Sequence, residues 1–184
     1  MKRFIAGIIF VFTVFTAQAQ SGSEIEVGAI GGFNFTNVIG PDVSGNAFRI
    51  GLHLGAYSKI PLQNGFGIRP EIHVFSRKGT ATGNYKSLYL DVPVLGTYEL
   101  DSEFDVLLGL QPSLLLSARV NDGRNITSAI RTIDVGVVAG GWYQLTNEFG
   151  FGIRFVPGLR RVGADGNEST YNFNVQLSVG YRFF

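Results

Sequence analysis

Residues 171–184 read YNFNVQLSVGYRFF, and apolar or aromatic residues occupy every odd position from Tyr171 to Phe183. The even positions carry Asn, Gln, Ser, Gly and Arg, until Phe184 ends the alternation. Because side chains alternate between the two sides of a strand, this segment predicts a β-strand with one apolar and one polar face. A tilted strand of about 10 residues crosses the apolar core of a bilayer. The segment is therefore long enough to span a membrane.

The composition indicates one apolar domain and excludes several classes of site. The chain has 184 residues, with 25 Gly, 16 Phe, no Cys and only 16% charged residues, and its mean hydropathy is +0.19. That length fits a single domain. Without Cys there is no disulfide framework, no Cys zinc site and no thiol nucleophile. A formal charge of +1, without a basic run, argues against nucleic acid as a partner.

Residues 1–19 have the pattern of a secretory signal peptide. A basic start (Lys2, Arg3) precedes a short apolar run and an Ala-Gln-Ala cleavage site at residues 17–19. A transmembrane anchor is the alternative, but the apolar run is shorter than the roughly 20 residues that a spanning helix needs. We therefore expect cleavage after position 19, which leaves residues 20–184 as the mature barrel domain.

Alternation like that of the C-terminal segment recurs along the chain and predicts eight strands. Their approximate ranges are 25–35, 48–59, 66–77, 85–100, 104–117, 133–145, 149–160 and 171–184. The connections alternate between long and short, as in outer-membrane barrels, whose extracellular loops are longer than their periplasmic turns. The predicted fold is all-β: an eight-stranded antiparallel up-and-down transmembrane β-barrel.

The alternation alone does not say which face is the core. A secreted lipocalin-like ligand binder, with apolar residues inside, is the alternative. The polar face mixes Gly with charges of both signs, however, and the apolar face has more large residues than an eight-stranded interior can hold. Aromatic residues also gather near the strand ends, as at membrane interfaces. We therefore expect the apolar face to contact lipid. Four prolines, Pro70, Pro93, Pro112 and Pro157, fall inside the predicted strands, where each removes a donor from the ladder. Bulges would accommodate them, and the sequence leaves open how they are accommodated.

Four segments carry a resemblance to a known family. They are YLDVPVLGTY (89–98), GLQPSLLLS (109–117), DVGVVAGG (134–141) and GYRF (180–183). With them the mature chain resembles the PorT-like outer-membrane β-barrel family of Bacteroidetes. The resemblance implies an OmpX- and OmpA-like eight-stranded barrel in the outer membrane of a Gram-negative bacterium. Most of that family has no assigned activity, one branch is associated with type IX secretion, and no catalytic residues carry over. Phe184 departs from the usual single terminal aromatic residue, which leaves open which Phe faces lipid.

The polar face predicts a charge network inside the barrel. Eight strands enclose a lumen that side chains just fill, and buried charges need partners, so we expect acids and bases to pair and plug it. A narrow channel is the alternative. The predicted lumen network is Glu26, Arg49, Arg69, Glu71, Asp91, Asp134, Arg154, Arg160 and Arg182. The same face carries His53, Lys59, His73, Arg77, Glu99 and Asp105.

His53 and His73 are the candidates for a metal site. Together with Glu71 or Asp91 they could bind a metal ion, although histidines hydrogen-bonded to carboxylates in a filled lumen are the simpler interpretation. A hydrolase site, as in lipid-modifying barrels, needs a base, a nucleophile and an orienting group in mutual reach. Both histidines fall in mid-strand rather than at a rim, so we expect no catalysis and no cofactor.

The expected role is structural or based on interactions. Functional contacts commonly lie on loops carried by a rigid scaffold, so protein partners are expected at the extracellular loops. Lipid of the outer membrane surrounds the barrel, and the barrel-assembly machinery is expected to recognise the C-terminal strand. The alternatives are an accessory barrel of a type IX-like secretion system and a lipid-modifying or metal-binding barrel.

Overall fold

The computed structural model describes residues 25–41, 47–81, 85–120, 123–162 and 169–184. The predicted signal peptide lies outside these residues, as do parts of the four predicted long loops. The strands are β1 (Glu26–Ile39), β2 (Arg49–Pro61), β3 (Phe66–Thr80), β4 (Tyr85–Asp91), β5 (Val94–Glu99), β6 (Phe104–Val120), β7 (Arg124–Asn125), β8 (Ile133–Gln144), β9 (Phe149–Arg161) and β10 (Tyr171–Arg182). A short 3-10 helix, η2, covers Thr127–Ala129. No helix in the described part of the chain is long and apolar enough to cross a membrane.

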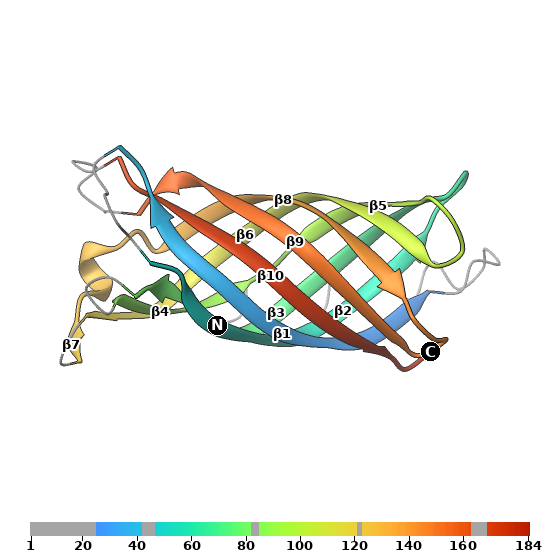
Figure 1. Cartoon of the computed structure of the whole chain (residues 1–184), viewed down its shortest axis with the longest axis horizontal. Helices are drawn as coiled ribbons and strands as arrows, with labels where there is room; N and C mark the ends of the chain where they lie inside the picture. The colour runs from blue at the N-terminus through green and yellow to red at the C-terminus, as the bar shows by residue number, and fades with distance from the viewer. Residues whose placement is uncertain (1–24, 42–46, 82–84, 121–122, 163–168) are drawn as a thin grey trace, which may run out of the picture.

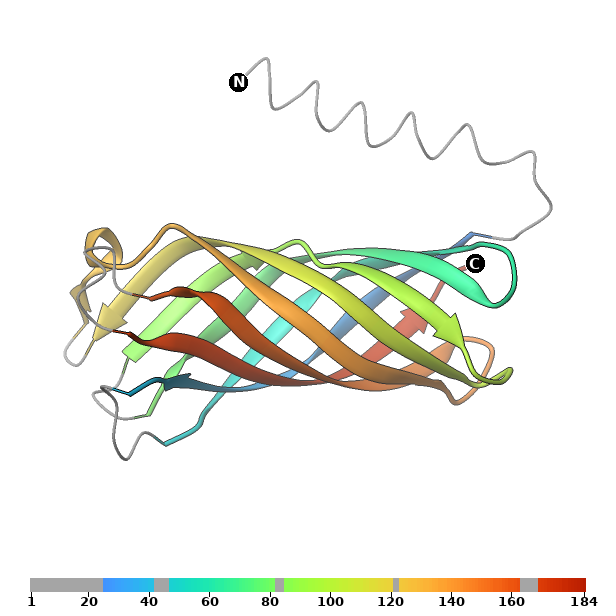
Figure 2. The same ribbon diagram turned by 90° about the horizontal axis from the view of Figure 1, so that it is seen from above.

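The strands form one closed, antiparallel barrel (Figures 1 and 2). The order around it is β3, β4 with β5, β6, β8, β9, β10, β1 and β2, and the pairing of β2 with β3 closes the ring. Strands β4 and β5 are two halves of one crossing, because both pair with β3 and with β6. The barrel therefore has eight crossings, and the predicted fold class is confirmed.

The prolines are accommodated in different ways. Pro93 lies in the break between β4 and β5, where its carbonyl accepts a hydrogen bond of 2.8 Å from the backbone of Glu71. Pro70 and Pro112 lie in continuous register with their neighbours, without a bulge. Pro157 does lie beside an irregularity, a register shift between β9 and β10.

The apolar face points outward. Large apolar side chains are exposed along the outside of the strands, including Leu54, Leu108 and Val74, while the fully buried side chains are mostly polar or charged. The lipocalin-like alternative requires the opposite arrangement and is wrong. Closure of the sheet pairs each strand with a neighbour on both sides, so no strand edge is exposed to lipid.

The two ends of the barrel differ. The turns at 62–65, 100–103 and 145–148 gather at the end where the C-terminus lies, which we call the turn end (Figure 1). The other four connections lie at the opposite end, the loop end. Part of the predicted polar loop at 119–128 is instead structured there as the end of β6, β7 and η2. In outer-membrane barrels as a class, the end with the longer connections is the extracellular one.

The C-terminal aromatic residues extend the outward row of β10. The rings of Tyr181 and Phe183 lie 5.6 Å apart, and Tyr181 lies 5.0 Å from Phe149 on β9. Phe183 therefore continues the outer face of the strand. The carbonyl of Phe184 accepts a hydrogen bond of 2.9 Å from the backbone of Val27, so the last residue takes part in the pairing with the first strand.

Candidate functional site

Glu71 is the centre of the charge network in the lumen. Arg154 donates to both of its carboxylate oxygens at 2.7 Å, and Arg69 Nε donates to Oε1 at 2.8 Å. His73 Nε2 lies 3.0 Å from Oε2, which as a carboxylate oxygen can only accept. The side chains of these four residues are almost completely buried. Bidentate Arg–carboxylate pairs are among the strong hydrogen-bonded contacts, so this cluster holds the middle of the barrel together.

Arg69 is also held between two aromatic rings. Its guanidinium carbon lies 4.0 Å from the ring centre of Tyr57 and 4.1 Å from that of Trp142. Tyr57 comes from β2 and Trp142 from β8, which lie on opposite sides of the closed sheet. A cation over an aromatic face is attracted by the ring's quadrupole, most strongly where water is excluded. Both rings lie on the polar face predicted from sequence, but nothing local in the sequence indicated that Arg69 would lie between them.

Glycines make the space that Trp142 occupies. A Cβ added at Gly150 would lie 2.6–2.7 Å from three atoms of the indole ring, and one at Gly180 would lie 2.7 Å from it. Gly152 is similarly close, at 2.8 Å. The Gly-Phe-Gly sequence at 150–152 is therefore a packing feature: its glycines point into the lumen beneath the indole, and the Phe between them points outward.

The two histidines stack on each other beside the Glu71 cluster. Their ring centres are 5.1 Å apart, with an angle of 27° between the planes. The amide nitrogen of Asn34 donates to the carbonyl of Arg77 at 3.1 Å, which assigns its Oδ1 as an acceptor. His53 Nδ1, 3.0 Å from that oxygen, is then the donor, and His53 Nε2 accepts from the Ser178 hydroxyl at 3.0 Å.

Ser178, His53 and Asn34 thus have the hydrogen-bond order of a catalytic triad. The hydrolase alternative requires a nucleophile, a base and an orienting group in mutual reach. All three side chains are buried, however, with 3% of Ser178 and 2% of His53 exposed, so a substrate cannot reach the hydroxyl. Both ring nitrogens of His53 are already hydrogen-bonded. Among the residues that the structure describes, no group of three or more His, Cys, Asp or Glu is placed to hold a metal ion.

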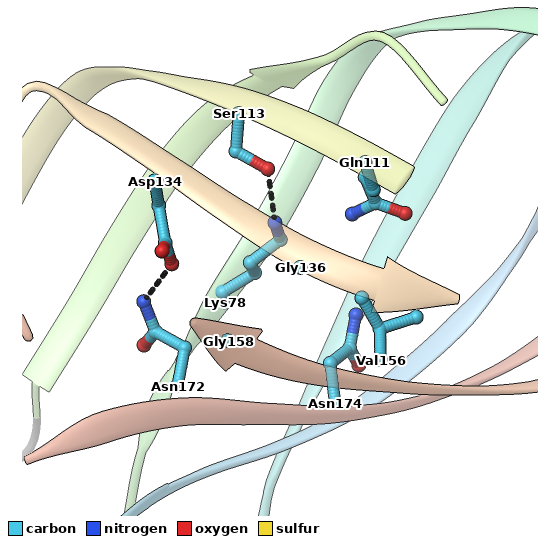
Figure 3. Close-up of a pocket in the computed structure, with 9 residues that line it drawn as sticks. All are labelled: Lys78, Gln111, Ser113, Asp134, Gly136, Val156, Gly158, Asn172 and Asn174. Carbon is cyan, nitrogen blue, oxygen red and sulfur yellow. Dashed lines mark hydrogen bonds between the residues drawn. The ribbon is translucent and has the colours of Figure 1, made fainter. Parts of the chain in front are cut away.

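A second polar cluster lies between the centre and the loop end. Lys78 donates to Asp91 at 2.8 Å and to Ser113 at 3.1 Å, and Asn172 donates to Asp134 at 2.7 Å. Lys78, Ser113, Asp134 and Asn172 line a cavity of about 10 Å³ (Figure 3), room for about one water molecule. Gln111 also lines it, and neither polar atom of its side chain has a protein partner in the described structure. The lumen is therefore filled here as well, apart from this small void.

Ion pairs also close the turn end of the lumen. Lys59 donates to Asp105 at 2.8 Å and to Glu99 at 2.9 Å. Arg182 and Glu26 form a pair at 3.1 Å with partly exposed side chains. Together with the Glu71 cluster and the Lys78 cluster, these contacts place charged pairs at three levels along the barrel axis.

The structure places the predicted lumen residues in different surroundings. Arg69, Glu71 and Arg154 meet in one cluster, Asp91 and Asp134 lie in the next, and Glu26 pairs with Arg182. Arg49 is half-buried at the loop end, beside Gly79. Arg160 is exposed instead of buried. It follows the register shift between β9 and β10, after which the alternation of burial along β9 is lost.

Arg77 was placed on the wrong face, and Lys78 was missed. The register of β3 shifts between His73 and Ser76, so the alternation changes phase there. Lys78 therefore points into the lumen and Arg77 points outward. Such a bulge inserts one residue into a strand and reverses the facing of everything beyond it. The alternation of apolar residues before this point could not reveal it.

Comparisons with known proteins agree with the barrel. Residues 16–163 match the model of a family described as the outer membrane protein beta-barrel domain. No curated protein matches the sequence. Ail, the attachment invasion locus protein of Yersinia pestis, is 14% identical with a TM-score of 0.55, over 87% of this chain and 99% of that chain. Neisserial surface protein A is 15% identical with a TM-score of 0.57, over 89% and 100%. At these identities the two structures show a shared fold only.

Proposed function

Because the chain belongs to the outer membrane protein beta-barrel domain family, we propose that it is a non-catalytic barrel with a structural or interaction role and a lumen closed by side chains. The observation that carries this proposal is the ion pair between Arg154 and Glu71. The two side chains come from strands on opposite sides of the barrel and meet inside the lumen. Arg69 and His73 fill the space beside it. An eight-stranded barrel has no room for a channel around such a cluster.

The experiment that tests the closed lumen is a conductance measurement in a planar bilayer. The refolded mature protein is expected to give no stepwise conductance, while a wide porin inserted under the same conditions confirms that the assay detects open barrels. Well-resolved steps that scale with the amount of inserted protein would support the narrow-channel alternative and reject a plugged lumen.

The finer proposal is that the chain belongs to the PorT-like branch of outer-membrane barrels. The four segments given above support it, as does the fold. We propose export by a cleaved signal peptide, assembly through the C-terminal strand and protein partners at the loop end. The supporting feature for assembly is the aromatic row of β10, which ends in Phe183 and Phe184.

A role in a type IX-like secretion system is the alternative within that branch, and only the sequence resemblance suggests it. Deleting the gene and comparing the proteins outside the cell separates the two roles. An unchanged set of exported proteins is expected for an interaction barrel, whereas their loss would favour the secretion role. Reintroducing the intact chain controls for effects on neighbouring genes.

A further inference from the structure

In the part of the chain that the structure describes, the exposed charges are segregated by sign. Among the exposed side chains that the structure describes, those with positive charge all lie towards the loop end: Arg77, Lys86, Arg119, Arg124, Arg160 and Arg161. Those with negative charge all lie at the turn end: Glu99, Asp101, Glu103 and Glu148. Four further acids, Asp42, Asp122, Asp165 and Glu168, belong to the loop segments outside the described residues.

Two of the cations face each other directly. Lys86 on β4 and Arg119 on β6 are register partners, so their side chains leave the same face of the sheet as nearest neighbours. Both are exposed on the outside of the barrel. No ion pair joins either of them to a carboxylate in the described part of the chain. Like charges directly opposite each other destabilise a sheet, and an anion bound between them would remove that repulsion.

Arg77 adds a third cation on the adjacent strand. It is the register partner of Leu88, two residues along β4 from Lys86, and it points outward because of the β3 bulge. A diagonal neighbour of this kind lies roughly 7–8 Å away, within reach of long side chains. We call Arg77, Lys86 and Arg119 the cationic patch. It covers three neighbouring strands, β3, β4 and β6, at the loop end.

The surface below the patch is apolar. Towards the turn end, the outer faces of the same three strands carry Ile72 and Val74, then Leu88 and Leu90, then Leu114 and Leu116. Cations at the membrane interface, followed by an apolar surface at membrane depth, match the two parts of a lipid with a phosphorylated head group. A soluble polyanion would use the charges but would gain nothing from the apolar surface.

We propose that the cationic patch binds the phosphate group of a lipid in the outer leaflet, with the lipid's acyl chains lying along the apolar surface below. Arg119 and Arg77 would bind phosphate oxygens with their planar guanidinium groups, and Lys86 would act as a point charge between them. This inference rests on the proposed membrane placement, with the loop end outward.

The test uses the barrel folded in phosphatidylcholine vesicles, with and without added bis-phosphorylated lipid A. The measured quantity is the temperature at which the folded, fast-migrating form is lost on a gel. A ligand that binds only the folded state raises this temperature, so lipid A is expected to raise it for the wild type. In the variant Lys86→Gln/Arg119→Gln, half-saturation should need about tenfold more lipid A or more, because two charge-assisted contacts are lost.

The matched control is Arg124→Gln/Arg160→Gln, which removes two cations from the same end but from outside the patch. It should keep the wild-type response. Without lipid A, Lys86→Gln/Arg119→Gln should be at least as stable as the wild type, because the repulsion is gone.

An equal response of the two double variants would overturn the proposal, and so would a wild type that does not respond. If inorganic phosphate alone raised the temperature as much as lipid A, the site would be an anion site and not a lipid site. A wild-type barrel without a heat-dependent form in phosphatidylcholine would instead contradict the membrane placement itself.

Discussion

Arg154 on β9 donates two hydrogen bonds of 2.7 Å to the two carboxylate oxygens of Glu71 on β3. Counted around the closed sheet, β9 is the fourth crossing from β3 in either direction, so this pair joins opposite sides of the barrel. The residues are 83 positions apart in the sequence. One carboxylate thus balances two buried guanidinium groups, so removing its charge leaves both without a counter-charge.

Glu71→Gln should destabilise the barrel strongly. The substitution keeps the shape of the side chain but leaves Arg69 and Arg154 buried without a counter-charge. Removing one partner of a buried ion pair typically destabilises a fold by about 3–5 kcal/mol. Urea unfolding of the protein in vesicles measures the change in free energy. Glu99→Gln is the control, because Glu99 is 46% exposed and its partner Lys59 keeps Asp105; its effect should stay within about 1 kcal/mol. Similar losses for both variants would contradict the central role of Glu71.

Gly150→Ala should disturb the packing of Trp142. The added Cβ would lie 2.6–2.7 Å from the indole ring, and overpacking of this kind destabilises by about 1–3 kcal/mol. Gly96→Ala is the matched control, since its Cβ would meet only a carbonyl oxygen at 3.5 Å. In a double-mutant cycle with Trp142→Leu, the effect of Gly150→Ala should largely disappear. An undiminished effect in the Leu background would show that the clash lies elsewhere.

Ser178 should be chemically inert despite its contact with His53. A fluorophosphonate probe should not label the folded protein, because the hydroxyl is buried. Ser178→Ala should reduce the unfolding free energy by about 1 kcal/mol, the usual contribution of one hydrogen bond. Added Zn²⁺ should leave the unfolding temperature unchanged, because both ring nitrogens of His53 are already bonded. Labelling of the wild type that Ser178→Ala abolishes would reopen the enzymatic alternative, and a rise in unfolding temperature with Zn²⁺ would reopen the metal site.

Most of the fold was predictable because its signal is local. Each strand carries its own alternation, and the contrast between long and short connections indicated how the strands are joined. Glu71, Arg69 and Arg154, three of the predicted lumen residues, are buried inside the barrel. The break at Pro93 and the order in η2 were not predictable, because both depend on neighbouring strands.

The errors come from places where the alternation changes phase. The β3 bulge exchanges the faces of the sheet on which Arg77 and Lys78 lie, and the irregular end of β9 exposes Arg160. The sequence also could not show which lumen side chains pair with each other, because the pairing depends on how the whole sheet closes. Arg154 reaches Glu71 only because β9 lies opposite β3 in the closed barrel.

The seam between the first and last strands has a consequence for biogenesis. Twelve residues of β1 pair with β10, from Gly28 opposite Arg182 to Ile39 opposite Tyr171. The ribosome makes β10 after all the other strands of the barrel, so a chain that stops before β10 has no strand to pair with the free edge of β1. Such a chain keeps an open edge that lipid cannot tolerate. Only a chain that includes β10 can therefore close the sheet into a sealed cylinder.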